Sequence, residues 1–201
     1  MQDLVLTGRE EVLRQLSCYV ALNTEDDERR VRIAAFVEAE SLCCSRTLSV
    51  GHLTGSAWVM NESGTHVLLL HHQKLEKWLQ PGGHADGDCN LRRVAEREVS
   101  EETGVRHLTP ALNTIFDLDI HTIPARGDEP AHQHYDLRYA FIAQDGESSL
   151  TGNEESNDVR WVALSELENF TREESVLRMR SKWLLRMSPA SLSQSLRHRP
   201  F

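Results

Sequence analysis

The sequence predicts an α+β protein in which helices cover a mixed β-sheet. Three observations lead to this fold class. Apolar residues recur at helical spacing in two segments before residue 45. Short, β-rich runs begin at residue 52, and the later strands and helices follow no regular βαβ repeat. We therefore expect an α/β/α sandwich around a mixed sheet, preceded by a helical extension.

The helical extension is predicted to span residues 1–45. Its two helices are expected at 9–22 and 30–42, where apolar side chains recur every three or four residues. Thr24 is a candidate N-cap, because a threonine hydroxyl can accept from a free backbone N–H and the acids after it suit the positive end of a helix dipole. The pattern leaves open whether these helices form a homodimer or cover a substrate site.

One main domain is expected at 46–187, followed by a frayed serine-rich tail at 188–201. Its first two strands, joined by a hairpin-like turn, are expected to be antiparallel. A helix should begin near Asn90 and end at Gly104, because glycine is the preferred residue just past a helix end. Strands are predicted at 52–60, 66–72, 112–121, 134–143 and 159–162, a short helix capped by Ser165, and a longer helix at 172–187.

The charge of the chain restricts its partners. The formal net charge is −9, whereas proteins that bind nucleic-acid polymers usually present a basic surface. An acidic protein can still bind a small anionic substrate if a metal ion supplies the positive charge. We expect a small nucleotide-type substrate and no nucleic-acid polymer.

The location of the protein is predicted from its apolar and cysteine content. No window approaches the length of an uncharged membrane span, and the first residues do not resemble a secretion signal. The four cysteines, Cys18, Cys43, Cys44 and Cys89, show neither CxxC spacing nor the density of a disulfide scaffold. We therefore expect reduced thiols in a cytoplasmic protein that has no membrane partner.

The predicted helix at 90–104 carries three carboxylates at positions i, i+3 and i+4, namely Glu98, Glu101 and Glu102. A charged helix face usually points to solvent. At about 100° per residue, however, Glu98 and Glu102 share the side of Leu91 and Ala95, with Glu101 flanking it. The outer face is predicted to carry Arg92, Arg93, Glu96, Ser100 and Thr103.

Carboxylates on the apolar side of a helix need compensation, because burial and mutual repulsion disfavour their charged forms. A divalent cation removes this cost, and oxygen ligands suit Mg²⁺ or Mn²⁺. Arg97 could orient a neighbouring carboxylate through a bidentate contact. Before the helix, Gly82 and Gly83 allow the backbone to approach a ligand closely, and His84 could contact phosphate.

Residues 83–105 resemble the Nudix box, whose pattern is Gx5Ex7REUxEExGU with U an aliphatic residue. The positions that match in register are Gly83, Arg97, Glu98, Val99, Glu101, Glu102, Gly104 and Val105. The resemblance implies the Nudix α/β/α sandwich and metal-assisted hydrolysis of a diphosphate linkage in a nucleoside diphosphate derivative.

The resemblance also implies roles for individual residues. Glu98 and Glu102 would be the principal metal ligands, Glu101 would assist, and the Gly83 carbonyl would complete the site. Family members often recruit a further acid from a later loop as base or ligand. Glu154 and Glu155 are the candidates, of which we choose Glu155; the alternative is that both are solvated loop acids.

Cys89 stands where the family pattern has glutamate. Asp86 or Asp88 could replace that carboxylate, and Cys89 could instead be a nucleophile or a redox switch. The departure also leaves open a weakly catalytic module that binds or senses a nucleotide. An isopentenyl diphosphate isomerase-like enzyme is disfavoured, because its active cysteine precedes the box and no cysteine lies between Cys44 and Cys89.

Ten histidines invite a second metal hypothesis. Those singled out are His71, His72, His84, His132 and His134. Without a partner cysteine or an HExxH helix, the sequence does not favour zinc. His52, Thr54 and Ser56 occupy alternating positions of the first strand, where either pocket lining or hydrogen bonding at the strand edge would explain them.

Overall fold

A computed structural model describes residues 8–127, 129–144 and 150–186. The predicted tail at 188–201 and the first residues of the extension therefore lie outside the described residues, as does part of the acidic loop after residue 144. The predicted α+β class is confirmed.

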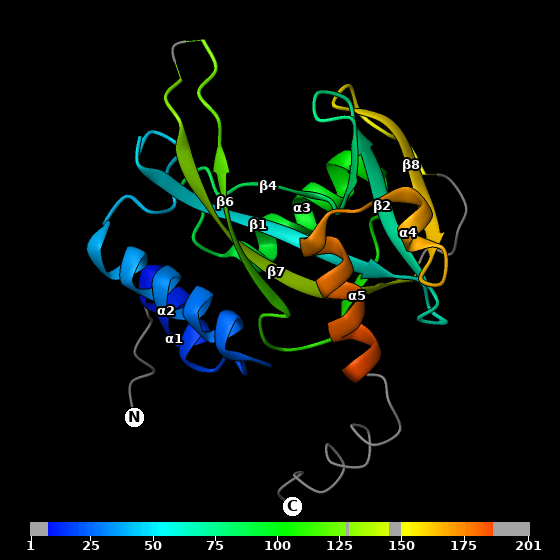
Figure 1. The fold of residues 1–201 in the computed structure, drawn as a ribbon, viewed down its shortest axis with the longest axis horizontal. Coiled ribbons are helices and arrows are strands. Elements are labelled where there is room, and N and C mark those ends of the chain that lie inside the picture. Colours follow the sequence, from blue (N-terminus) through cyan, green and yellow to red (C-terminus); the bar gives the residue numbers. More distant parts are fainter. Residues whose placement is uncertain (1–7, 128, 145–149, 187–201) are drawn as a thin grey trace, which may run out of the picture.

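The described residues form a mixed sheet of eight strands (Figure 1). Its main path runs β3-β2-β1-β7-β5, while β4 pairs with β1, β6 with β7, and β8 with β2. The β1–β7 pair is parallel and the other pairs are antiparallel. The strands are β1 (Gly51–Met60), β2 (His66–His72), β3 (Lys77–Leu79), β4 (Gly82–His84), β5 (Leu108–Pro110), β6 (Asp117–Ile123), β7 (His132–Ala143) and β8 (Ser156–Ala163).

Helices lie on both sides of the sheet, which gives the predicted sandwich (Figure 1). In the view drawn, α5 lies in front of the central strands, α3 lies behind them, and the two N-terminal helices lie together at the left. The helices are α1 (Gly8–Ser17), α2 (Thr24–Ala39), α3 (Leu91–Thr103), α4 (Leu167–Phe170) and α5 (Glu174–Arg186).

Strand β1 is buried along its whole length and separates two apolar cores. Because side chains alternate along a strand, Leu53, Ala57 and Val59 join the core that contains α1, α2 and α3. Trp58 and Met60 point the other way, into the core that contains α4 and α5. A fully buried central strand explains why this run carries so few charges.

Several predicted boundaries were wrong. The cap of α2 is Asn23 rather than Thr24, because the Asn23 side chain accepts from the Asp26 N–H at 2.8 Å while Thr24 is the first helical residue. Ser165 does not cap α4, whose N-cap is Glu166 without a side-chain hydrogen bond. The strand expected at 112–121 begins only at β6.

Thr103 was also misplaced by the helical wheel. It is buried and not part of the outer face, and its hydroxyl donates to the Val99 carbonyl at 2.6 Å within the last turn of α3. The ends of α3 are as predicted. Asn90 caps its start, accepting from the Arg93 N–H, and Gly104 ends it in the left-handed region with φ of 77°.

The N-terminal helices pack against the domain through buried polar contacts as well as apolar ones. The Lys182 ammonium on α5 lies 2.8 Å from the Asp26 carboxylate on α2 and 2.6 Å from Asp117 on β6. Phe36 stacks on Tyr135 of β7, with ring centroids 3.9 Å apart. These contacts join α2 to one edge of the sheet and to α5. That residues 1–45 form an extension separate from the main domain stays a prediction.

A disulfide joins Cys44 to Cys89, with the two Cα atoms 5.6 Å apart. The expectation of four reduced thiols was therefore wrong; Cys18 and Cys43 alone are free. Sequence spacing did not indicate the bond, because the fold brings together residues 45 positions apart. The cytoplasmic location no longer has support from the thiols and stays a prediction.

Candidate active site

Helix α3 lies unusually close to the strand beneath it. A Cβ atom at Gly55 of β1 would lie 2.6 Å from the Leu91 carbonyl oxygen and 3.2 Å from the Val94 side chain. Only glycine permits this approach of helix to strand. Gly55 was not among the predicted site residues, although a glycine inside a strand pattern is itself a signal of close backbone approach.

Strand β4 brings Gly83 against the Glu98 carboxylate. A Cβ atom at Gly83 would lie 2.5 Å from the Glu98 carboxyl carbon, which is closer than any side chain allows. The absence of a side chain at Gly83 thus leaves the carboxylate and the strand backbone in direct contact. This arrangement agrees with the predicted proximity of Gly83 and Glu98.

Glu102 is the most deeply buried carboxylate of the three, with 7% of its surface exposed. It accepts a hydrogen bond from the Gly82 N–H at 2.9 Å. Burial raises the pKa of Glu102 to about 8, the Gly82 hydrogen bond opposes this, and the nearby charges of Glu98 and Glu155 add to it. The Gly82 backbone therefore binds the Glu102 carboxylate directly. The predicted role of Gly82 in substrate binding stays a prediction.

Arg97 holds Glu98 through a single contact rather than the predicted bidentate one. Its Nη2 atom donates to Glu98 Oε1 at 2.6 Å and also to the His84 carbonyl at 3.1 Å. The guanidinium therefore ties the carboxylate to β4. Burial raises the pKa of Glu98, and the hydrogen bond from Arg97 opposes this rise.

Glu101 differs from its two neighbours. Its side chain is 60% exposed and lies 3.9 Å from the Arg97 Nε atom. The wheel thus predicted the inward direction of Glu98 and Glu102 correctly and placed Glu101 only at the flank of that side. Any metal contact of Glu101 would be made at the rim of the site.

The negative charge of Glu155 contributes to the raised pKa of Glu102. Its own side chain is exposed, and its backbone carbonyl accepts from the Gln73 N–H at 2.8 Å. Glu154, the alternative, is exposed as well and is not among the main contributors to the raised pKa of Glu102. The choice of Glu155 over Glu154 stays a prediction.

The residues around Cys89 have other partners. Asp86 pairs with Arg46 at 2.6 Å and Asp88 with Arg93 at 2.7 Å, so both loop acids are engaged by arginines. Cys89 itself faces Cys44 and Gly8 of α1. The disulfide removes the free thiol that a nucleophile requires.

His84 lies at the end of β4, where Arg46 donates to its Nδ1 atom at 3.2 Å. Its ring centroid is 5.0 Å from those of His52 and His134. Arg46 was not predicted as a neighbour, because it is 38 positions away in the chain. A contact of His84 with phosphate stays a prediction.

The residues present fit a divalent cation. Two inward carboxylates with raised pKa values lie beside a strand backbone that has no side chain at Gly83. Such a pair is costly when both members are charged and unpaired. Carboxylate and carbonyl oxygens are the ligands that Mg²⁺ and Mn²⁺ prefer.

The family follows from comparison with known proteins. The NUDIX domain model matches residues 52–183, and the protein belongs to this family. The chain is 25% identical over 103 residues to the uncharacterized Nudix hydrolase YvcI of Bacillus subtilis (strain 168), covering 51% of this chain and 61% of that protein. It is 25% identical over 144 residues to a probable DHNTP pyrophosphohydrolase of Lactococcus lactis subsp. cremoris (strain MG1363), covering 70% and 83% of the two chains.

Solved structures share the fold. A NUDIX hydrolase from Nitrosomonas europaea aligns with a TM-score of 0.52 at 16% identity, covering 66% of this chain and 88% of that one. The E. coli dihydroneopterin triphosphate pyrophosphohydrolase aligns with a TM-score of 0.51 at 13% identity, covering 66% and 92%. At these identities the likeness concerns the fold alone.

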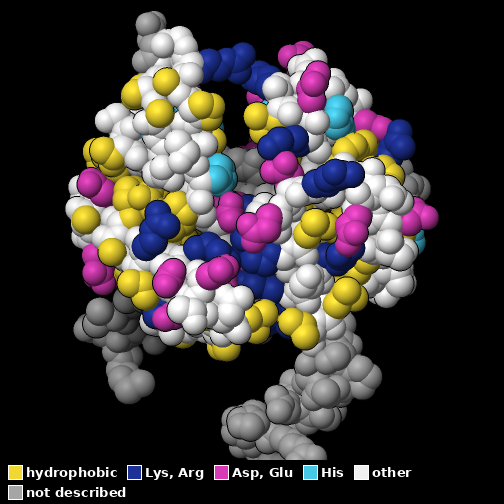
Figure 2. Space-filling model, viewed as in Figure 1, with side chains coloured by type: hydrophobic (Ala, Val, Ile, Leu, Met, Phe, Trp, Pro, Cys, Tyr) yellow, Lys and Arg dark blue, Asp and Glu magenta, His cyan; other side chains and the backbone are white. Residues whose placement is uncertain are grey.

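The surface mixes charges of both signs. Figure 2 shows basic and acidic side chains interspersed over the face that it draws, with no continuous basic track there. Among the described residues, no helix is both long and apolar enough to cross a membrane. That the protein binds a small anionic substrate and no nucleic-acid polymer stays a prediction.

The raised pKa of Glu102 predicts how stability depends on pH without metal. The folded-state pKa of about 8 exceeds the ordinary 4.5, so the contribution of Glu102 is fully present below pH 4.5 and is lost as the pH rises through about 8. A tenfold difference between the acid dissociation constants of the folded and unfolded states corresponds to roughly 1.4 kcal/mol. Denaturant unfolding with EDTA should therefore show a steeper loss of stability in the wild type than in Glu102→Gln.

Glu101→Gln is the matched control, because Glu101 is exposed on the same helix. Its profile should follow that of the wild type, and Mg²⁺ should flatten the wild-type profile. Superimposable profiles for the wild type and Glu102→Gln would show that Glu102 is not held in a desolvated site.

Proposed function

We propose that the protein hydrolyses a diphosphate linkage in a nucleoside diphosphate derivative or a related small anionic substrate, using Mg²⁺ or Mn²⁺. The observation that carries the proposal is the inward pair Glu98 and Glu102, packed against the Gly82–Gly83 backbone. Family membership supports the reaction class. When bound, the cation would neutralise charge on phosphoryl oxygens and make a bound water more acidic.

The proposed division of labour follows the contacts of each residue. Glu98 and Glu102 hold the cation with the Gly83 carbonyl, and Glu101 assists from the rim. Arg97 is a positioning residue, since its contacts with Glu98 and with the β4 backbone fix the carboxylate. Gly82 serves by donating to Glu102.

We assign the role of general base to Glu155. A carboxylate near the cation but outside its inner ligands can accept a proton from the attacking water. Its position in a loop agrees with this, because it can approach the substrate without disturbing α3. His84 is proposed to contact a substrate phosphate from the end of β4.

The substrate is best identified with a panel. It should contain ADP-ribose, dinucleoside polyphosphates, damaged nucleoside triphosphates and sugar nucleotides. Dihydroneopterin triphosphate belongs in it too, because it is the substrate in the name of the Lactococcus lactis relative. Binding of a nucleotide without any hydrolysis across the panel would favour the sensing module instead.

Replacing either inward carboxylate should remove most turnover. Glu98→Gln and Glu102→Gln each keep the side-chain shape but remove an anionic metal ligand. We expect kcat to fall at least about 100-fold, which corresponds to about 2.7 kcal/mol of lost transition-state stabilisation. The measurement is phosphate or nucleotide release at saturating Mg²⁺, with circular dichroism to verify folding.

Glu96→Gln, on the same helix but outside the carboxylate pair, is the control and should keep the wild-type rate. Normal turnover in Glu98→Gln or Glu102→Gln would sink the assigned mechanism.

Glu155→Gln should lower kcat by about 10²- to 10⁴-fold, the usual contribution of a general base. The adjacent Glu154→Gln is the matched control and should change kcat little. In Glu155→Gln the acidic limb of the pH–rate profile, where the base becomes protonated, should disappear while the alkaline limb persists. If both substitutions change kcat equally little, Glu155 is not the general base and both residues are solvated loop acids.

A further inference from the structure

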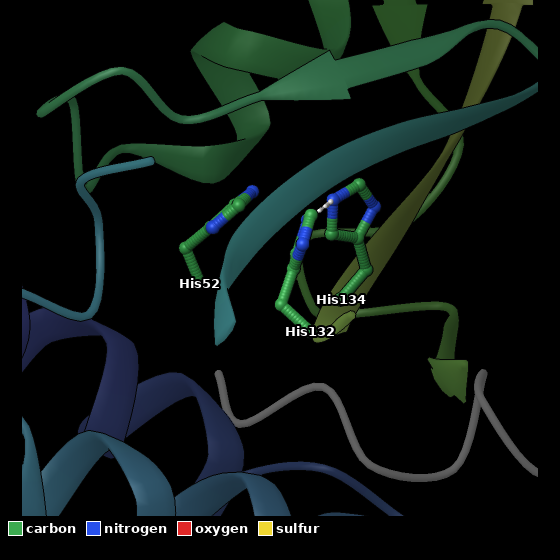
Figure 3. A group of neighbouring side chains, drawn as sticks. All are labelled: His52, His132 and His134. Carbon is green, nitrogen blue, oxygen red and sulfur yellow. Dashed lines mark hydrogen bonds between the residues drawn. The ribbon is translucent and has the colours of Figure 1, made fainter. Parts of the chain in front are cut away.

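Three histidines lie close together at the beginning of β1 and β7, apart from the Glu98 and Glu102 carboxylates. The parallel pairing of β1 and β7 sets His52 opposite His134, and His132 lies two residues earlier on the same face of β7. One ring nitrogen from each lies within 4.8 Å of the others. Figure 3 shows the His132 and His134 rings joined by a hydrogen bond, with His52 apart from them near the beginning of β1.

Among the described residues, neither ring nitrogen of His52 has a hydrogen-bond partner. The residue is 1% exposed, and both Nδ1 and Nε2 are buried without a hydrogen bond. The Leu48 backbone lies near enough to favour the protonated ring slightly, yet no hydrogen bond of ordinary geometry forms. Burying an imidazole without a hydrogen-bond partner costs free energy. A ligand bound to a His52 ring nitrogen would offset this cost.

His132 is oriented as a metal-binding histidine usually is. Its Nδ1 atom lies 2.9 Å from the Pro130 carbonyl, which can only accept, so Nδ1 carries the proton and Nε2 presents a lone pair in the neutral ring. A backbone carbonyl that holds the second ring N–H in this way is a recurring support of metal-ligating histidines.

The spacing of the rings suits a tetrahedral ion. The Nε2 atoms of His132 and His134 lie 3.3 Å apart in a hydrogen bond, which the His134 Nε2–H donates because His132 carries its proton on Nδ1. An ion bound by both Nε2 atoms would take the place of that proton. Two imidazole nitrogens, each about 2.0–2.1 Å from a tetrahedral zinc ion, also lie about 3.3 Å apart. One ring nitrogen of His52 lies within 4.8 Å of both, so the His52 ring would have to move to complete the ligand set.

We propose that His52, His132 and His134 form a zinc site at the beginning of β1 and β7. Three imidazoles are a borderline-soft ligand set that suits Zn²⁺ and not Mg²⁺. The fourth ligand is assigned to Glu129, whose carboxylate lies 4.0 Å from His132 Nε2 and is exposed enough to move. The ion would join the two strands and the β6–β7 connection.

The surroundings favour neutral rings, which metal binding requires. Burial lowers the pKa of His52 to about 4 and that of His134 to about 2, and neighbouring histidines lower both pKa values further. His84 borders the cluster but is not a ligand, because its Nδ1 accepts from Arg46. A further neighbour is His121, with its ring 5.3 Å from that of His134.

The test is equilibrium dialysis of the full chain, free of any histidine tag, against Zn²⁺ with Mg²⁺ in excess. The wild type should bind one tightly held Zn²⁺ per chain, and His134→Gln should bind it at least about tenfold more weakly. His66→Gln, on β2 beside the far end of β1, is the control and should bind like the wild type. His132→Gln provides a second variant if His134→Gln fails to fold.

Two further arms locate the ion. The Glu98→Gln/Glu102→Gln double variant should still bind Zn²⁺. Failure of the zinc site can therefore be distinguished from failure of the proposed hydrolytic site. Co²⁺ in place of Zn²⁺ should give visible absorption without an intense near-ultraviolet thiolate band. The proposal is overturned if the wild type binds no stoichiometric Zn²⁺, if His134→Gln binds normally, if the double variant loses the ion, or if the thiolate band appears.

Discussion

The close packing of α3 on β1 and β4 is the constraint on which the site depends. Gly55 lets the helix backbone approach β1, and Gly83 lets β4 touch the Glu98 carboxylate. A side chain at Gly55 would push the helix backbone outward, and one at Gly83 would displace the Glu98 carboxylate from β4. Exposure of Glu98 and Glu102 to water would return their pKa values toward normal and remove the need for a cation.

A buried ionic network holds the strands on the opposite side of β1. The Arg138 guanidinium is 2% exposed and pairs with Asp136 at 2.7 Å and with Asp117 at 3.2 Å. Asp136 also accepts from the hydroxyls of Thr54 and Ser56. Buried charges of this kind often specify one arrangement more than they add net stability. Here they fix the register of β1 against β7, and with it the histidine cluster.

The sequence predicted the parts of the structure that depend on local pattern. The fold class, the ends of α3 and the inward direction of Glu98 and Glu102 follow from periodicity, capping and helical geometry. Thr54 and Ser56 proved to donate to a neighbouring strand, the simpler of the two interpretations. These features need only residues close together in the chain.

The features that were missed join residues far apart. The Cys44–Cys89 disulfide, the Arg46 contacts and the pairing of His52 with His134 each depend on how the strands assemble. No pattern within one segment indicates which distant partner a cysteine or histidine will meet.

The central claim is that Glu98 and Glu102 hold a divalent cation beside Gly83. Anomalous diffraction from crystals soaked in Mn²⁺ tests it most directly. We expect an anomalous peak between the two carboxylates and the Gly83 carbonyl. A saturating soak that leaves this position empty, or that places Mn²⁺ only elsewhere, would contradict it.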